Sequence, residues 1–338
     1  MKVVLLVHTD LIPPEDIIEK DLDWSKVAWS TEYDVKKALL GLGYDLRILG
    51  VSESLKKIRD SIKEFQPHVV FNLLEEFQGE AIFDQNVVSY LELLGIPYTG
   101  ANPKAMIIGR DKALSKKILS YHKIRTPKFQ VFPRNQPRKK LRLLEFPLIV
   151  KCLNEEASLG ISQASVVHSE EKLKERVQYI HSRFRTDAIA EQFIEGSEYF
   201  VGVMGNYRLE TLPVWALKFA EVGHPEKEFY STSAKFDEEY RDRKGISTGP
   251  AEISDELSTL LQKTAKRAYK TLGMSGYARM DFRVNKEGQP FLLEANPNPD
   301  ISEFDDFAES AKKKGYTYQK LLEKIIRLGR QWSPTDNH

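Results

Sequence analysis

Short apolar runs alternate with stretches of helical spacing through the first hundred residues. Such runs, bounded by polar residues, are typical of buried strands. Apolar side chains that recur every three or four residues are typical of amphipathic helices, and Gly43 stands where a helix-ending glycine belongs. Strands that alternate with helices indicate a parallel sheet. The predicted strands are Val3–Val7, Leu46–Val51, His68–Asn72 and Ile96–Thr99, and the predicted helices are residues 32–42 and 81–94.

The pattern along the rest of the chain predicts two further units, so we expect an α/β protein (α/β with α+β character) of three domains. The domains are residues 1–103, 104–187 and 188–330, followed by a tail at 331–338. In the second unit we predict helices at Lys112–Tyr121 and 169–182 and strands at Phe129–Phe132 and Leu148–Lys151. In the third we predict strands at Ala188–Ile194, Tyr277–Val284 and Pro290–Asn296 and helices at Asp255–Leu272 and 317–328.

One long segment, residues 221–250, has little periodicity and is rich in Gly, Pro, Ser and charged residues. Segments of this length without regular structure inside a compact domain are usually functional lids or disordered. We predict a lid, and Lys235 lies within it.

Composition narrows the class of protein. The chain has 50 Lys and Arg residues and 49 Asp and Glu residues, so its positive and negative charges nearly cancel. This balance gives no reason to expect nucleic acid or a membrane surface as partner. The single cysteine, Cys152, excludes a disulfide framework and a cysteine-clustered zinc site. No apolar run reaches the ~18 residues that would span a bilayer. We expect a cytoplasmic protein that acts on small molecules.

The predicted hairpin at 277–296 carries the strongest chemical signal. Side chains two apart on a strand share a face, so Arg279 and Asp281 project together, as do Glu294 and Asn296 on the returning strand. With residues 285–288 as the turn, Arg279 lies opposite Glu294. Two carboxylates and an amide oxygen are ligands that Mg²⁺ prefers. The alternative is a solvent-exposed face with a cross-strand ion pair.

Two lysines occupy positions suited to phosphate. Lys151 ends an apolar strand and precedes a short loop with a single glycine, Gly160, whose backbone could face an anion. Lys112 stands at a helix start, where anions are favoured. For either lysine taken alone, an ordinary surface role is the favoured interpretation.

A third signal is the strand at Ala188–Ile194, which runs into an acidic turn. Backbone groups there could read a purine edge, and Glu198, seven residues after Glu191, could bind ribose hydroxyls. A strand-end turn without any ligand explains the same residues.

Taken together, these motifs resemble the ATP-grasp superfamily and, within it, the D-alanine–D-alanine ligase family. The resemblance covers nearly the whole chain, because the motifs occur in the family's order and spacing. They are residues 95–100, Asp111-Lys112, Ile149-Val150-Lys151, Glu191 to Glu198, Ala234-Lys235, Arg279-x-Asp281 and residues 293–296.

The resemblance implies a three-domain ATP-grasp architecture, with ATP held between the central and carboxy-terminal domains, and an amide bond formed through an acyl phosphate. It implies that Arg279 and Lys235 are catalytic and that two Mg²⁺ ions, for which Mn²⁺ could substitute, are held by Asp281, Glu294 and Asn296. The implied ATP contacts are Lys112, Lys151, Ser158, Glu191, Gln192, Ile194, Glu198 and Lys235. The resemblance also suggests a homodimer.

Several positions depart from the family pattern. Ala157 replaces the first of two loop serines, and Phe236 replaces a lid tyrosine. Asp300 stands at a family glycine, and Asp305 stands where a serine would hold the carboxylate of the acceptor. Carboxylates there would repel an amino-acid carboxylate and attract a cationic amine. The resemblance gives the family's amino-terminal glutamate no secure match, with Glu32 a poor candidate.

After the third strand, Glu75 and Glu80 lie where the family's substrate loop lies, so the resemblance implies that Glu75, Glu80, Asp300 and Asp305 face the substrates. A solvated loop explains Glu75 and Glu80 equally well. The leading hypothesis is an ATP-dependent carboxylate–amine ligase related to D-alanine–D-alanine ligase. Two alternatives stay open: D-alanine–D-alanine ligase itself, and a nucleotide-binding regulatory module that has lost turnover.

Overall fold

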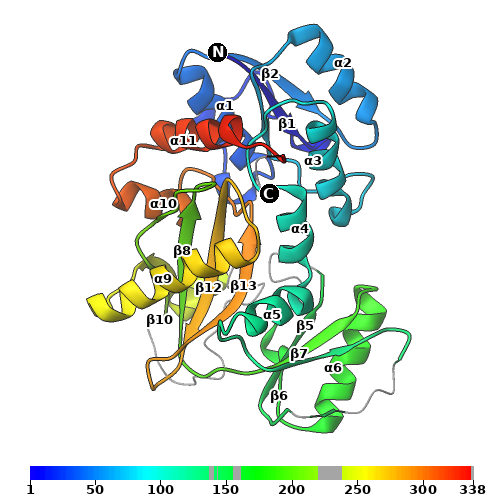
Figure 1. The fold of residues 1–338 in the computed structure, drawn as a ribbon, viewed down its shortest axis with the longest axis vertical. Coiled ribbons are helices and arrows are strands. Elements are labelled where there is room, and N and C mark those ends of the chain that lie inside the picture. Colours follow the sequence, from blue (N-terminus) through cyan, green and yellow to red (C-terminus); the bar gives the residue numbers. More distant parts are fainter. Residues whose placement is uncertain (137–140, 143, 155–160, 220–237, 336–338) are drawn as a thin grey trace.

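The computed structural model describes residues 1–136, 141–142, 144–154, 161–219 and 238–335 (Figure 1). Within them, three separate sheets follow one another along the chain. The first, at one end of the molecule, is a parallel sheet in the order β2–β1–β3, in which Leu5 pairs with Ile48 on one side and Phe71 on the other. Its elements are β1 (Lys2–Val7), α1 (Ser30–Gly41), β2 (Asp45–Gly50), α2 (Leu55–Phe65), β3 (Val69–Asn72) and α3 (Asp84–Leu93).

The segment Ile96–Thr99, predicted as a fourth strand, is not one. It makes a single parallel bridge, between Tyr98 and Val70, with Val70 N–H donating to the Pro97 carbonyl at 2.8 Å. Pro97 has no N–H to add to a ladder, and Gly100 turns the chain away at φ 99°. The parallel sheet therefore ends at β3 within the described residues.

The second sheet is antiparallel and has four strands in the order β4–β7–β5–β6, and helix α6 packs on it. Its elements are β4 (Phe129–Phe132), β5 (Leu148–Cys152), β6 (Val166–Val167), α6 (Glu170–Arg183) and β7 (Ala188–Gln192). Ser169 caps α6 by accepting a hydrogen bond from Lys172 N–H. Because β7 pairs with both β4 and β5, this sheet crosses the boundary predicted at residue 187. We propose that the chain has the three predicted domains and that the second domain ends after β7.

The third sheet has the order β11–β10–β8–β12–β13, with β9 paired to β8, and α9 lies across it. Its elements are β8 (Ser197–Met204), β9 (Glu210–Thr211), β10 (Trp215–Phe219), β11 (Ile246–Pro250), α9 (Asp255–Thr271), β12 (Tyr277–Val284) and β13 (Pro290–Pro297). The segment predicted as an irregular lid, residues 221–250, ends in regular structure: helix α8 (Glu238–Lys244) and then β11, which pairs with β10. Residues 220–237 of that segment lie outside the described residues.

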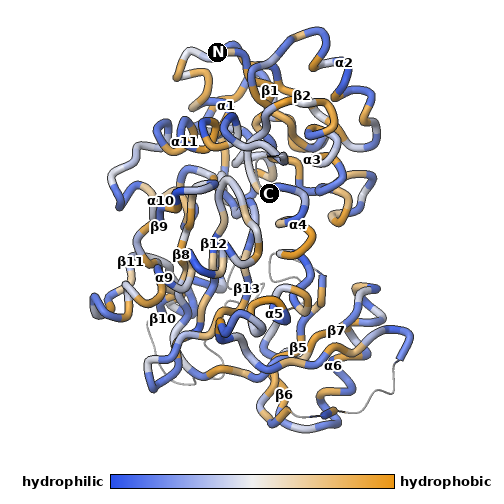
Figure 2. Tube along the Cα trace, viewed as in Figure 1, coloured by the Kyte–Doolittle hydropathy of each residue, from blue (hydrophilic) through white to orange (hydrophobic). Residues whose placement is uncertain are grey.

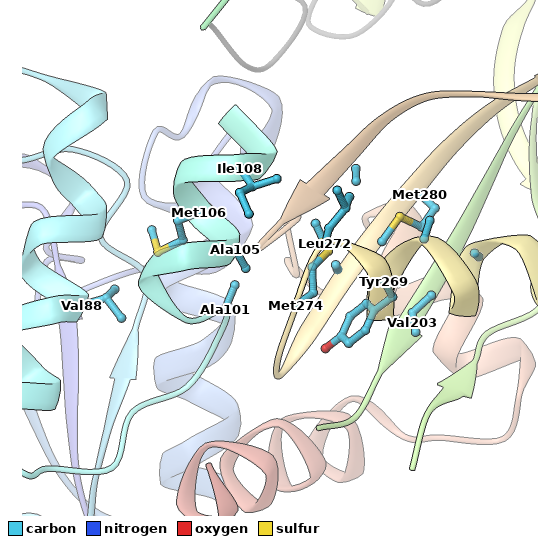
Figure 3. Packing of buried hydrophobic residues seen from close by; sticks show 14 of the residues in the cluster. Val88, Ala101, Ala105, Met106, Ile108, Val203, Tyr269, Leu272, Met274 and Met280 are labelled. Carbon is cyan, nitrogen blue, oxygen red and sulfur yellow. The ribbon is translucent and has the colours of Figure 1, made fainter. Parts of the chain in front are cut away.

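Helix α4 (Pro103–Arg110) connects the first sheet to the rest of the molecule. Asn102 caps it by accepting a hydrogen bond from Ala105 N–H at 3.0 Å, and the Asn102 side-chain amide also donates to the Gly273 carbonyl at 2.8 Å. In Figure 3, Ile108 and Ala105 of α4 face the side of the core that holds Leu272 and Met274. Burying each such large apolar side chain contributes about 1.5–3 kcal/mol, so α4 is fixed to the third sheet as well as to the first.

The chain's last helices return to its beginning. Helices α10 (Asp306–Lys313) and α11 (Tyr318–Gln331) follow the third sheet, and α11 lies beside α1 (Figure 1). Buried apolar residues of β1, β3, α1, α10 and α11 form one core, with Leu322 and Ile325 packed among Val3, Leu5 and Leu39. The hydropathy colouring in Figure 2 shows the same apolar stretches along these strands and helices. No described helix has the length and apolar character needed to cross a membrane.

Candidate active site

The hairpin of β12 and β13 brings the predicted metal ligands together, but in a different register from the predicted one. Asp281 lies opposite Glu294, and Arg279 lies opposite Asn296. Two features cause the difference. The loop closes at Asn285, whose side-chain oxygen accepts from Gln289 N–H at 2.8 Å, and the register then shifts between Asp281 and Phe282. Such a bulge adds one residue to one strand and so moves all later pairs by one.

Asp281 is the centre of this cluster. Arg279 donates two hydrogen bonds to it, from Nε to Oδ1 at 2.8 Å and from Nη2 to Oδ2 at 2.9 Å, and Asn296 Nδ2 donates to Oδ2 at 2.9 Å. The guanidinium of Arg279 also lies over the ring of Phe200, 5.0 Å from its centroid. Burial lowers the pKa of Arg279, but Asp281 outweighs burial and holds that pKa well above its ordinary value, with smaller contributions from Asp305 and Asp306.

Lysines from two elements meet on one buried carboxylate. Lys116 Nζ and Lys151 Nζ each lie 3.3 Å from a different oxygen of Glu191. Burial raises the pKa of Glu191, but the two lysine charges outweigh it and hold the pKa below its ordinary value. Glu191 therefore stays ionised. Burial lowers the pKa of Lys116, whereas Glu191 and then Glu294 outweigh burial and raise the pKa of Lys151. Sequence reasoning missed Lys116, although it stands one helical turn after Lys112 and so shares its helix face.

Lys112 is the first residue of α5 (Lys112–Tyr121), which Asp111 caps by accepting from Ala113 and Leu114 N–H groups. The Lys112 side chain is buried, and its Nζ lies 3.6 Å from Glu294 Oε2. Burial raises the pKa of Glu294, but Lys112 and then Lys151 outweigh it and lower that pKa to about 2. Lys112, Lys151 and Glu294 thus form one continuous charged network across α5, β5 and β13.

A second buried ion pair, between Arg283 and Glu198, lies beyond the end of β7. Arg283 donates from Nη1 to the Ile194 carbonyl at 3.1 Å, and its Nε lies 3.8 Å from Glu198. Burial raises the pKa of Glu198, and Arg283 only partly opposes this. Gln192 is exposed at the end of β7, and its backbone N–H donates to the Lys128 carbonyl. The backbone groups predicted to read a purine edge are therefore partly used within the protein.

Further carboxylates come from helix α1, from the segment after β3 and from the segment after β13. Glu32 lies in the first turn of α1 and is buried, although sequence analysis treated it as a poor candidate. Burial, and then the charges of Glu75 and Asp300, raise the pKa of Glu32 to about 7. Glu75 and Asp300 thus both lie within electrostatic reach of Glu32. Glu80 pairs through its backbone with Phe77 in a local turn, and none of the described side-chain contacts joins it to Glu32 or Asp300.

Two predicted ATP contacts, Ser158 and Lys235, lie outside the described residues, as do Ala157 and Phe236. Among the described residues, no group of three or more His, Cys, Asp or Glu side chains is arranged to hold a metal ion. The predicted magnesium ligands are not a group of that kind, since they combine the carboxylates of Asp281 and Glu294 with the side-chain amide of Asn296. Oxygen donors of this type suit Mg²⁺, and Arg279 beside them suits charge stabilisation at a reacting oxygen.

Comparison with known proteins gives these features a context. The sequence model of the family "D-ala D-ala ligase C-terminus" matches residues 113–327. The chain is 31% identical to D-alanine–D-alanine ligase of Aquifex aeolicus over 89% of this chain and 95% of that protein. It is 33% identical to the uncharacterized protein y4sG of Sinorhizobium fredii over 76% and 73% of the two chains. The fold matches D-alanine–D-alanine ligase from Bacillus anthracis with a TM-score of 0.74 and 25% identity, covering 97% of each chain.

These matches confirm the predicted α/β architecture of the ATP-grasp type and the predicted enzyme class. The chain belongs to the D-alanine–D-alanine ligase family and is an ATP-dependent ligase that forms a carbon–nitrogen bond.

Proposed function

We propose that this ligase activates a carboxylate with ATP and joins it to an amine acceptor that lacks the carboxylate of D-alanine. The observation that carries the proposal is the start of α10, where Asp305 and Asp306 precede Phe307. The ring of Phe307 packs against Tyr277 of β12, the strand that carries Arg279. Both carboxylates contribute to the raised pKa of Arg279, so both lie within electrostatic reach of the residue that would stabilise the reacting centre. An acceptor with its own carboxylate would meet two like charges there, whereas a cationic amine would be attracted.

In the first step, the substrate carboxylate attacks the γ-phosphate of ATP and gives an acyl phosphate and ADP. Lys112, Lys151 and Lys116 support this proposal, because they form a buried cationic network that can hold phosphate oxygens. Glu191, Ile194 and Glu198 would bind the nucleoside between the second and third sheets. Mg²⁺ would offset phosphate charge when held by Asp281, Glu294 and Asn296.

In the second step, the amine attacks the acyl carbon, and phosphate leaves. Arg279, fixed by its two hydrogen bonds to Asp281, can stabilise the oxyanion that forms, because a guanidinium held in place needs little rearrangement. Lys235 and the lid segment would exclude water from the acyl phosphate. The homodimer that the family resemblance suggests remains a prediction.

The test is ADP release from ATP and Mg²⁺ against pooled amino acids, dipeptides and polyamines, with mass spectrometry of each active pool. A product equal in mass to an acid plus an amine less water identifies both substrates. Formation of D-alanyl-D-alanine as the main product would overturn the proposed acceptor. Tight ATP binding with no turnover in any pool would favour the regulatory module.

A further inference from the structure

The open end of the β12–β13 hairpin lies against the short connection between the first sheet and α4. The hairpin is closed by the turn after β12 and is open where β12 begins and β13 ends. The connection contains Gly100 and Ala101, and Ala101 is labelled in Figure 3 beside the start of α4. Gly276 and Asn298, the residues just outside the two strands, both approach Gly100 closely. One connection therefore contacts both strands that carry the candidate metal ligands.

Asn298 joins the end of β13 to this connection. Its Oδ1 accepts a hydrogen bond from Ala101 N–H at 2.6 Å, across 197 residues of sequence. Ala101 is buried, so its N–H group needs an acceptor inside the protein. The backbone of Asn298 has φ 52°, in the left-handed region that asparagine adopts more readily than most other non-glycine residues. The hydrogen bond and the backbone conformation are therefore both suited to asparagine at this position.

The packing around Gly100 leaves little room for movement of Asn298. Gly100 has φ 99°, and a Cβ atom placed on it would lie 2.5 Å from Asn298 Oδ1 and 3.1 Å from Asn298 Cγ. Gly276 has φ 69°, and a Cβ atom placed there would collide with the Gly100 carbonyl. Next along the chain, Asn102 N–H donates to Ser275 Oγ at 2.9 Å. The hydrogen bond of Asn298 is thus part of a closely fitted junction.

The stiffness of the chain beyond Asn296 connects this junction to the candidate metal site. Asn296 Nδ2 donates to Asp281 Oδ2 at 2.9 Å. Only Pro297, whose ring fixes its φ, separates Asn296 from Asn298. Helix α4 packs on that ring so closely that a Cβ atom on Gly109 would lie 2.7 Å from Pro297 Cδ. A displacement of Asn298 is therefore passed on to Asn296 and is not absorbed between them.

We propose that Asn298 is a positioning residue of the metal site: the hydrogen bond from Ala101 N–H fixes the end of β13, and this end holds Asn296 where it can bind the metal. The proposal rests on the proposed function, which assigns Mg²⁺ to Asp281, Glu294 and Asn296. Groups that orient metal ligands without touching the metal typically change metal affinity by about 10- to 100-fold. Metal binding therefore depends on a connection that lies outside the second and third sheets.

The experiment measures ADP binding to the full chain by calorimetry, once with Mg²⁺ and once with a chelator in its place. The ratio of the two dissociation constants is the metal contribution. Asn298→Gly keeps the left-handed backbone without steric cost and removes the acceptor. Asn298→Asp keeps both, because aspartate tolerates this conformation and its carboxylate accepts the same hydrogen bond. Asn285→Gly is the matched control, since Asn285 Oδ1 accepts from Gln289 N–H at 2.8 Å at the closed end of the same hairpin.

We expect Asn298→Gly to lower the metal contribution by about tenfold. Asn298→Asp and Asn285→Gly should leave it within about twofold of wild type. Thermal unfolding of each variant shows that the protein measured is folded. An unchanged metal contribution in Asn298→Gly overturns the proposal. An equal loss in Asn285→Gly overturns it as well, because any loosening of the hairpin would then have the same effect, and so does a loss in Asn298→Asp as large as that in Asn298→Gly.

A double variant tests whether Asn298 acts through Asn296. If it does, Asn298→Gly should cause no further loss of the metal contribution in a protein that already carries Asn296→Ala. Losses that add in the double variant overturn the proposal. If Asn296→Ala alone leaves the metal contribution unchanged, the proposed metal site is wrong and the positioning role falls with it. That outcome differs from a failure of the positioning role alone, in which Asn296→Ala lowers the metal contribution and Asn298→Gly does not.

Discussion

Lys112 Nζ and Glu294 Oε2 lie 3.6 Å apart, and this ion pair joins the start of α5 to β13. Sequence analysis assigned the lysine to phosphate and the carboxylate to Mg²⁺. The pair shows that the two assignments describe one place, because a phosphate bound by the lysine would lie next to the metal ligands.

The metal assignment predicts that Glu294→Ala and Asn296→Ala each lower ADP release by about 100-fold or more while the protein stays folded. Glu287→Ala serves as control, since Glu287 is exposed in the turn of the same hairpin. ADP release over a range of Mg²⁺ concentrations and thermal unfolding of each variant provide the measurements. Near wild-type turnover in either site variant would show that the metal lies elsewhere.

Glu32 should make the stability of the free protein depend on pH. Its pKa is raised from 4.5 to about 7, first by burial and then by Glu75 and Asp300. The folded protein therefore holds the Glu32 proton more tightly than the unfolded chain does. The stabilisation is complete below pH 4.5 and is lost as the pH rises to 7.

The neutral variant Glu32→Gln does not undergo this loss. As the pH rises from 4.5 to 8, wild type loses this stabilisation and Glu32→Gln does not. The free energy of unfolding of Glu32→Gln should therefore increase relative to that of wild type by up to about 3 kcal/mol. Urea unfolding at the two pH values measures the difference, with Asp45→Asn, at an exposed acid, as control. A constant difference between Glu32→Gln and wild type would contradict the assignment of the raised pKa to Glu32.

Asp305 should control the choice of acceptor. Replacing it by serine removes a charge close to Arg279, so amines with a free carboxylate should become better acceptors, with KM lower by about tenfold. Glu303→Ser removes a charge from the same loop, but Glu303 is exposed and is not among the main causes of the raised pKa of Arg279. Acceptor KM values in both variants give the comparison, and an identical response would mean that Asp305 does not face the acceptor.

Lys116 should be needed for stability as well as for the charge of the site. Lys116→Met leaves Glu191 with one cationic partner and removes a donor from the Leu293 carbonyl, so we expect a loss of about 3 kcal/mol. Lys174→Met is the matched control, because the Lys174 side chain is 71% exposed in its pair with Glu170. Its cost should stay below about 0.5 kcal/mol. Chemical denaturation of both variants tests this, and equal stability losses would argue against a buried lysine network.

Local periodicity was enough to predict which strand and helix positions carry several of the candidate site residues. The period-two pattern of β12 placed Arg279 and Asp281 together, and the helix start at Asp111 placed Lys112, because both depend on neighbours in sequence. The bulge after Asp281 could not be predicted, since the extra residue in β13 has no distinct local signal. The environment of Glu32 could not be predicted for a different reason: it depends on tertiary burial and on charges that include Asp300, which is distant in the sequence.

The common core of β1, β3, α1, α10 and α11 has a consequence for synthesis of the protein. A chain that leaves the ribosome amino-terminus first exposes the apolar face of the parallel sheet before α11 exists to cover it. The first sheet therefore completes its packing only after the last helix has emerged. We expect the nascent chain to need protection from aggregation until α11 has been synthesised.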